Sequence, residues 1–125
     1  MADIHTFIGR HIEMGIDIEV KIKADFDILT EDRASEINSF WIEPDTRLME
    51  CDDDARQTVV RMAAEYFINA VFAKDYVTVR AANHEFYEAE GWGDYDYNGI
   101  VLVEFDGGPD LTFDMIEIEE IENAD

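Results

Sequence analysis

The uninterrupted alternation of apolar and polar side chains over residues 16–28 constrains the fold more than any other feature. Its apolar positions are Ile16, Ile18, Val20, Ile22, Ala24, Phe26 and Ile28. A period of two is typical of a strand that places one face in the core. Because this run exceeds the usual length of a strand, we expect a bulge or bend near residues 23–25. Residues 4–8 are predicted to be its hairpin partner.

The middle of the chain has the periodicity of helices. Thr30 is predicted to cap a helix over residues 31–41, which Pro44 ends. A second helix is expected to begin near residue 51, and a third over residues 76–90. The apolar stripe of the first helix is Ile37, Phe40 and Trp41. The stripe of the second is Val60, Ala63, Ala64, Phe67 and Val71. The stripe of the third is Val79, Ala82 and Phe86. The spacing within the second predicts the most buried helix.

Residues 98–118 have the pattern of a hairpin, because two apolar runs flank the turn-forming sequence DGGPD. The predicted order is therefore β-β-α-α-α-β-β. Strands at both ends of a helical middle favour a single α+β domain over residues 1–125, with an antiparallel sheet packed against two or three helices.

Charge is the most informative part of the composition. Nine Lys and Arg residues stand against 31 Asp and Glu, for a net charge of −22. All nine basic residues precede residue 81, so the remainder of the chain has none. This imbalance repels polyanions, which excludes direct binding to nucleic acid or to anionic membranes. Adaptation to high salt is an alternative explanation, and the presence of only three lysines fits it.

Several patterns that carry chemistry are absent or incomplete. Residues 93–105, GDYDYNGIVLVEF, begin like a calcium loop with Asp94, Asp96 and Asn98. The required glutamate does not stand at position 12, and a strand follows, so we predict no specific metal site. The carboxylates of residues 52–54 fit helix capping better than magnesium binding. Cys51 is the single cysteine, which excludes an internal disulfide.

No enzymatic motif is present either. His5, His11 and His84 are scattered, and no phosphate-binding loop or nucleophile motif occurs. We therefore predict no catalytic residues and no cofactor. No apolar run is long enough to cross a membrane, and the N-terminus does not resemble a secretion signal, so a cytoplasmic location is expected.

The acidic C-terminal third contains aromatic residues that could bind a protein partner. The predicted partner-binding residues are Trp92, Asp94, Tyr95, Asp96, Tyr97, Asp110, Asp114, Glu117, Glu119, Glu120 and Glu122. Alternate acids on a strand would present a row of negative charge to a basic groove, with the aromatic side chains as anchors. A solvated face that only confers solubility is the alternative explanation.

Residues 29–48, LTEDRASEINSFWIEPDTRL, resemble a domain-of-unknown-function family of phages, prophages and plasmids. The matching positions are Leu29, Thr30, Glu31, Glu36, Ile37, Asn38, Phe40, Trp41, Arg47 and Leu48. A weaker similarity follows in EGWGDYDYNGI. The resemblance implies a mobile-element setting and brings no catalytic residue. Asn38 and Arg47 are its polar positions of interest.

These observations together favour an acidic module that binds a protein with a basic surface. Its sharpest form is an inhibitor that mimics nucleic acid and occupies the site of a nucleic-acid-handling enzyme. One alternative is an accessory or structural protein of a mobile element whose acidity serves solubility. Another alternative is a small cation-dependent enzyme.

Overall fold

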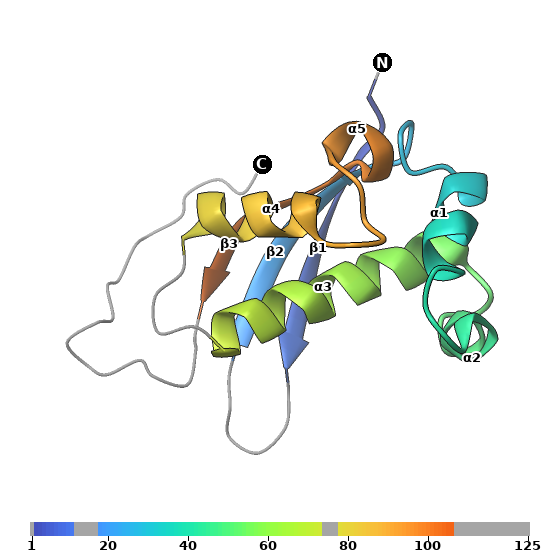
Figure 1. Ribbon diagram of the computed structural model, residues 1–125, viewed down its shortest axis with the longest axis horizontal. Coiled ribbons are helices and arrows are strands. Elements are labelled where there is room, and N and C mark those ends of the chain that lie inside the picture. Colours follow the sequence, from blue (N-terminus) through green and yellow to red (C-terminus); the bar gives the residue numbers. More distant parts are fainter. Residues whose placement is uncertain (1, 12–17, 74–77, 107–125) are drawn as a thin grey trace.

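The computed structural model describes residues 2–11, 18–73 and 78–106, which form three strands and five helices (Figure 1). Their order is β1 (Ile4–His11), β2 (Ile18–Asp25), α1 (Glu31–Asn38), α2 (Pro44–Glu50), α3 (Ala55–Ala73), α4 (Val79–Glu88), α5 (Tyr95–Asn98) and β3 (Ile100–Asp106). The strands form one antiparallel sheet in the order β1-β2-β3. The predicted α+β class is confirmed. The second strand of the predicted C-terminal hairpin lies outside the described residues.

Strand β2 is the centre of the sheet and confirms the alternating pattern. Its inward side chains are fully buried, and they are Ile18, Val20, Ile22 and Ala24. The strand ends at Asp25 rather than Ile28, because the Asp25 carboxylate accepts a hydrogen bond from the Asp27 N–H at 2.9 Å and starts a turn. The bulge is also displaced from the predicted position, and it falls between Lys21 and Ile22 opposite β3.

Helices α3 and α4 cover one face of the sheet, with α3 over β1 and β2 and α4 beside β3 (Figure 1). The predicted stripe of α3 is buried in the core, from Val60 to Val71. Strand β1 approaches α3 so closely that a Cβ atom at Gly9 would lie 2.7 Å from the Cβ atom of Ala64. A side chain at position 9 would therefore push β1 away from the helix.

The region after α1 corrects the predicted helix boundaries. Helix α1 ends at Asn38, and Phe40 is exposed rather than core-facing. Pro44 begins the separate helix α2 instead of ending the first helix. Proline suits the first turn of a helix because its missing N–H has no intrahelical partner there.

Asn38 and Arg47 join α1 to α2. The Arg47 guanidinium donates to the Asn38 side-chain oxygen at 2.9 Å and to the Ile42 carbonyl at 2.7 Å. The Asn38 amide in turn donates to the Pro44 carbonyl at 3.1 Å. These contacts give both residues a structural role in holding residues 39–43 between the two helices.

The starts of α3 and α4 are capped by side chains. The Asp54 carboxylate accepts from the Gln57 N–H at 3.1 Å, and α3 begins at Ala55. The Thr78 hydroxyl accepts from the Ala81 N–H at 3.0 Å, so α4 starts later than predicted from residue 76. The predicted capping role of the carboxylates at residues 52–54 is confirmed for Asp54.

Candidate functional site

The segment between α4 and β3 carries the predicted aromatic and acidic residues, and Trp92 joins it to the core. The Trp92 side chain is 4% exposed. Its ring centroid lies 4.6 Å from that of Phe86 and 5.2 Å from that of Trp41. A ring buried this deeply packs inside the domain and is not available as a surface anchor.

Asn98 fixes the same segment from inside. Its fully buried side chain donates to the carbonyls of Trp92 and Gly93, at 3.1 and 3.3 Å, and accepts from the Ile100 N–H at 2.8 Å. Gly99 follows with a φ of +70°, and a Cβ atom there would lie 2.8 Å from the Asp25 carbonyl oxygen. The asparagine–glycine pair therefore places residues 92–99 in one position against β2 and β3.

Tyr95 and Tyr97 lie on the short helix α5 and are partly buried. The Tyr97 hydroxyl donates to the Glu36 carboxylate at 3.1 Å, and the Arg33 guanidinium lies 4.2 Å from the centre of the Tyr97 ring. Burial is the first cause that raises the pKa of both tyrosines. Tyr97 therefore joins α5 to α1 and keeps only part of its ring at the surface.

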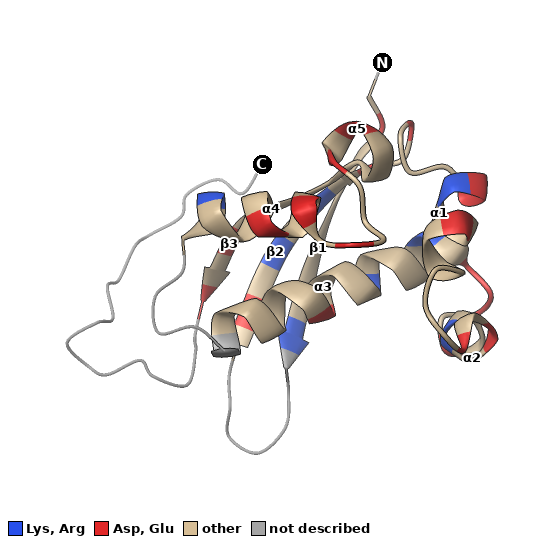
Figure 2. Ribbon diagram, viewed as in Figure 1, with Lys and Arg blue, Asp and Glu red and all other residues tan. Residues whose placement is uncertain are grey.

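We call the set of exposed carboxylates on α4, on α5 and on the segment between them the acidic surface. It consists of Glu85, Glu88, Glu90, Asp94 and Asp96. Figure 2 shows where these acidic positions lie along the ribbon. The sequence from 81 to 106 contains no lysine or arginine, and the His84 ring lies 3.4 Å from the Glu88 carboxylate. Of the predicted partner-binding residues, Asp94 and Asp96 therefore lie together on an exposed surface.

The other acidic residues predicted to bind a partner lie outside the described part of the chain. They are Asp110, Asp114, Glu117, Glu119, Glu120 and Glu122. Their row along a strand stays a prediction.

The residues that resemble a calcium loop do not converge. Asp94 and Asp96 are exposed, whereas Asn98 is fully buried and its oxygen is bonded to Ile100. Within the ranges that the structure describes, no three His, Cys, Asp or Glu side chains gather in a way that could hold a metal ion. Over the same ranges, no helix is both long and apolar enough to cross a membrane.

Comparison with protein families identifies the chain. The family model described as "Protein of unknown function (DUF2528)" matches residues 19–120. The chain belongs to the DUF2528 family. The match starts within β2, includes every described helix and β3, and leaves out β1. Comparison with curated proteins and with solved structures gives no significant match.

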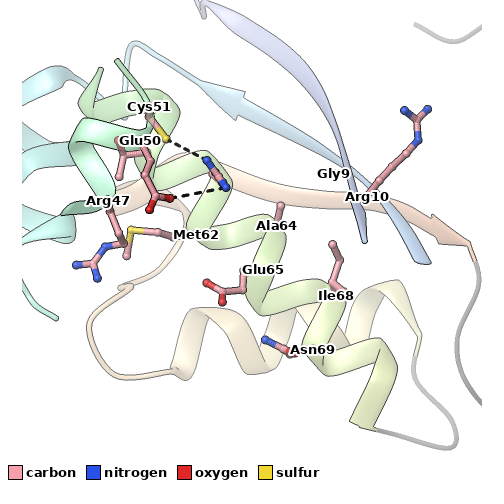
Figure 3. A pocket seen from close by; sticks show the side chains of 12 residues that line it. Gly9, Arg10, Arg47, Glu50, Cys51, Met62, Ala64, Glu65, Ile68 and Asn69 are labelled. Atoms are coloured by element: carbon pink, nitrogen blue, oxygen red, sulfur yellow. Dashed lines mark hydrogen bonds and ion pairs between the residues drawn. The ribbon is translucent and has the colours of Figure 1, made fainter. Parts of the chain in front are cut away.

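The DUF2528 domain also has a groove, away from the acidic surface, that was not predicted from the sequence. The groove has a volume of about 840 Å³ and lies between β1, α2 and α3 (Figure 3). Three arginines line it: Arg10 from β1, Arg47 from α2 and Arg61 from α3. The Arg61 guanidinium lies 3.9 Å from both the Glu50 carboxylate and the Cys51 sulfur. The sequence offered one indication of this groove, because all lysine and arginine residues lie within the first 80 positions.

Tyr87 in α4 gives the DUF2528 domain a pH-dependent contact. Its hydroxyl donates to the Ile100 carbonyl at 2.6 Å, and burial, with smaller effects of Tyr95 and Asp94, raises the pKa of Tyr87 to about 12. The unfolded chain releases this proton near the ordinary pKa of 10. The folded state therefore binds more protons between these two values, and its stability falls as pH rises through that interval.

Replacing Tyr87 with phenylalanine tests this contact. We expect Tyr87→Phe to be less stable than the parent near neutral pH, because the Ile100 carbonyl loses its donor. We also expect its free energy of unfolding to fall less steeply between pH 10 and 12. Urea unfolding at several pH values measures both quantities. Parallel pH profiles for the two proteins would contradict the assignment.

Proposed function

We propose that this DUF2528 protein is a protein-binding module whose acidic surface docks on a basic surface of its partner. The observation that carries the proposal is the gathering of exposed carboxylates on α4, α5 and the segment between them. Together with the net charge of −22, such a surface attracts cationic proteins over long range and accelerates their association. It repels nucleic acid for the same reason.

The segment that carries part of the acidic surface is fixed to the core of the domain, which supports a role in binding rather than in solvation alone. Asn98 and Trp92 hold the segment that carries Asp94 and Asp96 against the core, through bonds and ring contacts that do not involve solvent. Carboxylates on a preorganised segment lose little conformational entropy when a partner binds. A surface that served solubility would not need this fixed geometry.

The sharper form of the proposal is an inhibitor that occupies the nucleic-acid site of a basic enzyme. Exposed carboxylates present fixed negative charge in the way that phosphates do, and residues 81–125 contain no lysine or arginine that would interrupt it. The mobile-element setting that the resemblance implies fits a role against a host enzyme. Competition between the protein and DNA or RNA for the captured partner separates inhibition by mimicry from docking elsewhere.

Charge reversal tests which surface binds. We expect Glu88→Lys, Glu90→Lys and Asp96→Lys, combined in one variant, to weaken partner binding by about tenfold or more, a loss of roughly 1.4 kcal/mol. The matched control combines Asp27→Lys, Asp32→Lys and Asp45→Lys, which changes the net charge equally at exposed positions on other parts of the fold. The measurement is the affinity for a partner captured from lysate of the encoding organism, with circular dichroism to verify folding.

The control variant separates docking from bulk charge. If the control weakens binding as much as the first variant, net charge and not the acidic surface determines the interaction. If neither variant changes binding, the acidity serves solubility, and a saturable calcium or magnesium titration would favour a cation-dependent enzyme instead.

A further inference from the structure

The two edge strands of the sheet, β1 and β3, differ in whether their outward-pointing N–H and carbonyl groups have hydrogen-bond partners. Asp25 N–H donates to the Gly99 carbonyl at 2.8 Å, so Ile100 and Leu102 direct their backbone groups away from β2. Side chains cover all four groups. Asn98 and Tyr87 bond the N–H and carbonyl of Ile100, at 2.8 and 2.6 Å. The Asn83 amide bonds both groups of Leu102, at 2.8 and 2.9 Å. These contacts cover the outer edge of β3 at Ile100 and Leu102.

Strand β1 has no such cover from the residues that the structure describes. The Phe26 N–H donates to the Asp3 carbonyl at 2.9 Å, so the hydrogen-bonded pairs with β2 fall at odd-numbered positions of β1. The backbone groups of Ile4, Thr6 and Ile8 therefore point to the free edge. Over the residues that the structure describes, no side chain or strand is bonded to them there. This edge offers a row of unpaired donors and acceptors.

The side chains of β1 leave this edge accessible. Natural edge strands are commonly protected by proline, lysine or a bulge. Residues 4–11 contain neither proline nor lysine, and their register with β2 is continuous. Ile4 and Ile8 are 46% and 47% exposed on the face away from α3. Arg10, near the end of β1, is its one Lys or Arg residue. An edge strand without proline, lysine or a bulge is a template for pairing with another strand.

The groove beside β1 gives side chains of an added strand a place to pack. The groove is lined by Gly9 and Arg10 of β1 and by Met62, Ile68 and Asn69 of α3. The charged side chains of Arg47, Glu50, Arg61 and Glu65 line it as well. Proteins that bind peptides by strand addition use the edge strand for main-chain hydrogen bonds and a neighbouring groove for alternate side chains. The apolar groups of Met62 and Ile68 favour apolar side chains in the groove.

We propose that the free edge of β1 binds an extended segment of a partner protein, which adds a further strand to the sheet. The occupant is a segment in which apolar residues alternate with polar ones, with its apolar side chains beside Met62 and Ile68 of the groove. A second copy of this chain is disfavoured, because two molecules of charge −22 would lie side by side. The inference goes beyond the proposed function, because it concerns the sheet edge opposite the one beside the acidic surface.

Proline at position 6 tests strand addition without breaking the existing sheet. Thr6 does not donate to β2, so Thr6→Pro removes an edge donor and leaves the β1–β2 ladder intact. The matched control is Thr6→Ala, which keeps the N–H. The probe is a synthetic peptide in which valine and lysine alternate. Binding is measured by titration and by amide hydrogen exchange of the full chain.

In the free protein, we expect the amides of Ile4, Thr6 and Ile8 to exchange rapidly and that of Phe7 to be protected. The peptide should slow exchange at Ile4, Thr6 and Ile8. Thr6→Pro should weaken peptide binding by about tenfold or more, whereas Thr6→Ala should change it by less than roughly twofold.

Three results would overturn the inference. The first is protection of Ile4, Thr6 and Ile8 in the free protein, which would mean that the chain itself or a second copy covers the edge. The second is the absence of added protection with the peptide in large excess. The third is peptide binding that survives Thr6→Pro but is lost on charge reversal of the acidic surface, which would leave the proposed function intact.

Discussion

Replacing Phe86 with alanine is expected to lower the free energy of unfolding by about 3–5 kcal/mol. Phe86 is fully buried and stands at the centre of an aromatic cluster. Its ring centroid lies 4.7 Å from that of Phe67, 5.3 Å from that of Tyr66 and 4.6 Å from that of Trp92. Deleting the ring leaves a cavity where α3, α4 and the segment after α4 meet. Urea unfolding followed by tryptophan fluorescence measures the loss.

Phe40→Ala is the matched control for this prediction. The Phe40 side chain is 52% exposed, so the same chemical change should cost less than about 1.5 kcal/mol. Equal losses from the two substitutions would contradict the placement of Phe86 in the core.

Replacing Asn98 with alanine should have an effect of similar size for a different reason. The substitution leaves the carbonyls of Trp92 and Gly93 and the N–H of Ile100 without their partner. A buried group without a partner costs about 1–3 kcal/mol, so we expect a total loss of roughly 3–5 kcal/mol. Chemical unfolding measures this loss, and amide exchange at Ile100 should show local opening of the edge at β3.

Two further variants make the second prediction specific. Asn98→Asp keeps an acceptor for Ile100 but places carboxylate oxygens against the two carbonyls, so it should be destabilised nearly as strongly as the alanine variant. Asn69→Ala, at an exposed position of α3, should change stability by less than about 0.5 kcal/mol. A stable Asn98→Asp protein would show that the amide does not donate to the loop.

The elements that could be predicted from the sequence are those with an unbroken hydrophobic period. The alternation through Ile18, Val20, Ile22 and Ala24 is a local property of the chain, and it predicts β2 correctly. The stripe of α3 is predictable for the same reason. The end of β2 at Asp25 depends instead on one side-chain bond to Asp27, which the period does not contain.

The helix boundaries around residues 38–44 were predicted wrongly, because the residue types there are compatible with two different structures. Pro44 is compatible both with the end of one helix and with the first turn of another. The Arg47 guanidinium donates hydrogen bonds to the side-chain and backbone oxygens of Asn38. These bonds hold residues 39–43 in a short turn, and α2 follows directly. These hydrogen bonds join residues on two helices, so the sequence around either residue does not predict them.

The candidate site was predictable in composition but not in geometry. Acids and aromatic residues gather in residues 85–97, which the sequence shows. The burial of Trp92 depends on Trp41 and Phe86, and the position of α5 depends on Asn98. Among the described residues, Asn83 and Tyr87 cover backbone groups on the outer edge of β3, and no side chain does so at β1. These contacts depend on the folded arrangement of α4.

Docking of the acidic surface on a basic partner is tested most directly by capture from lysate of the encoding organism, with elution by a salt gradient. The parent protein, the variant with Glu88, Glu90 and Asp96 reversed to lysine, and the control variant are compared side by side. We expect the parent and the control to retain the same basic protein until moderate salt, because salt screens exposed charges, and the reversed variant to release it earlier. Retention of that protein by all three to the same salt concentration would contradict the account.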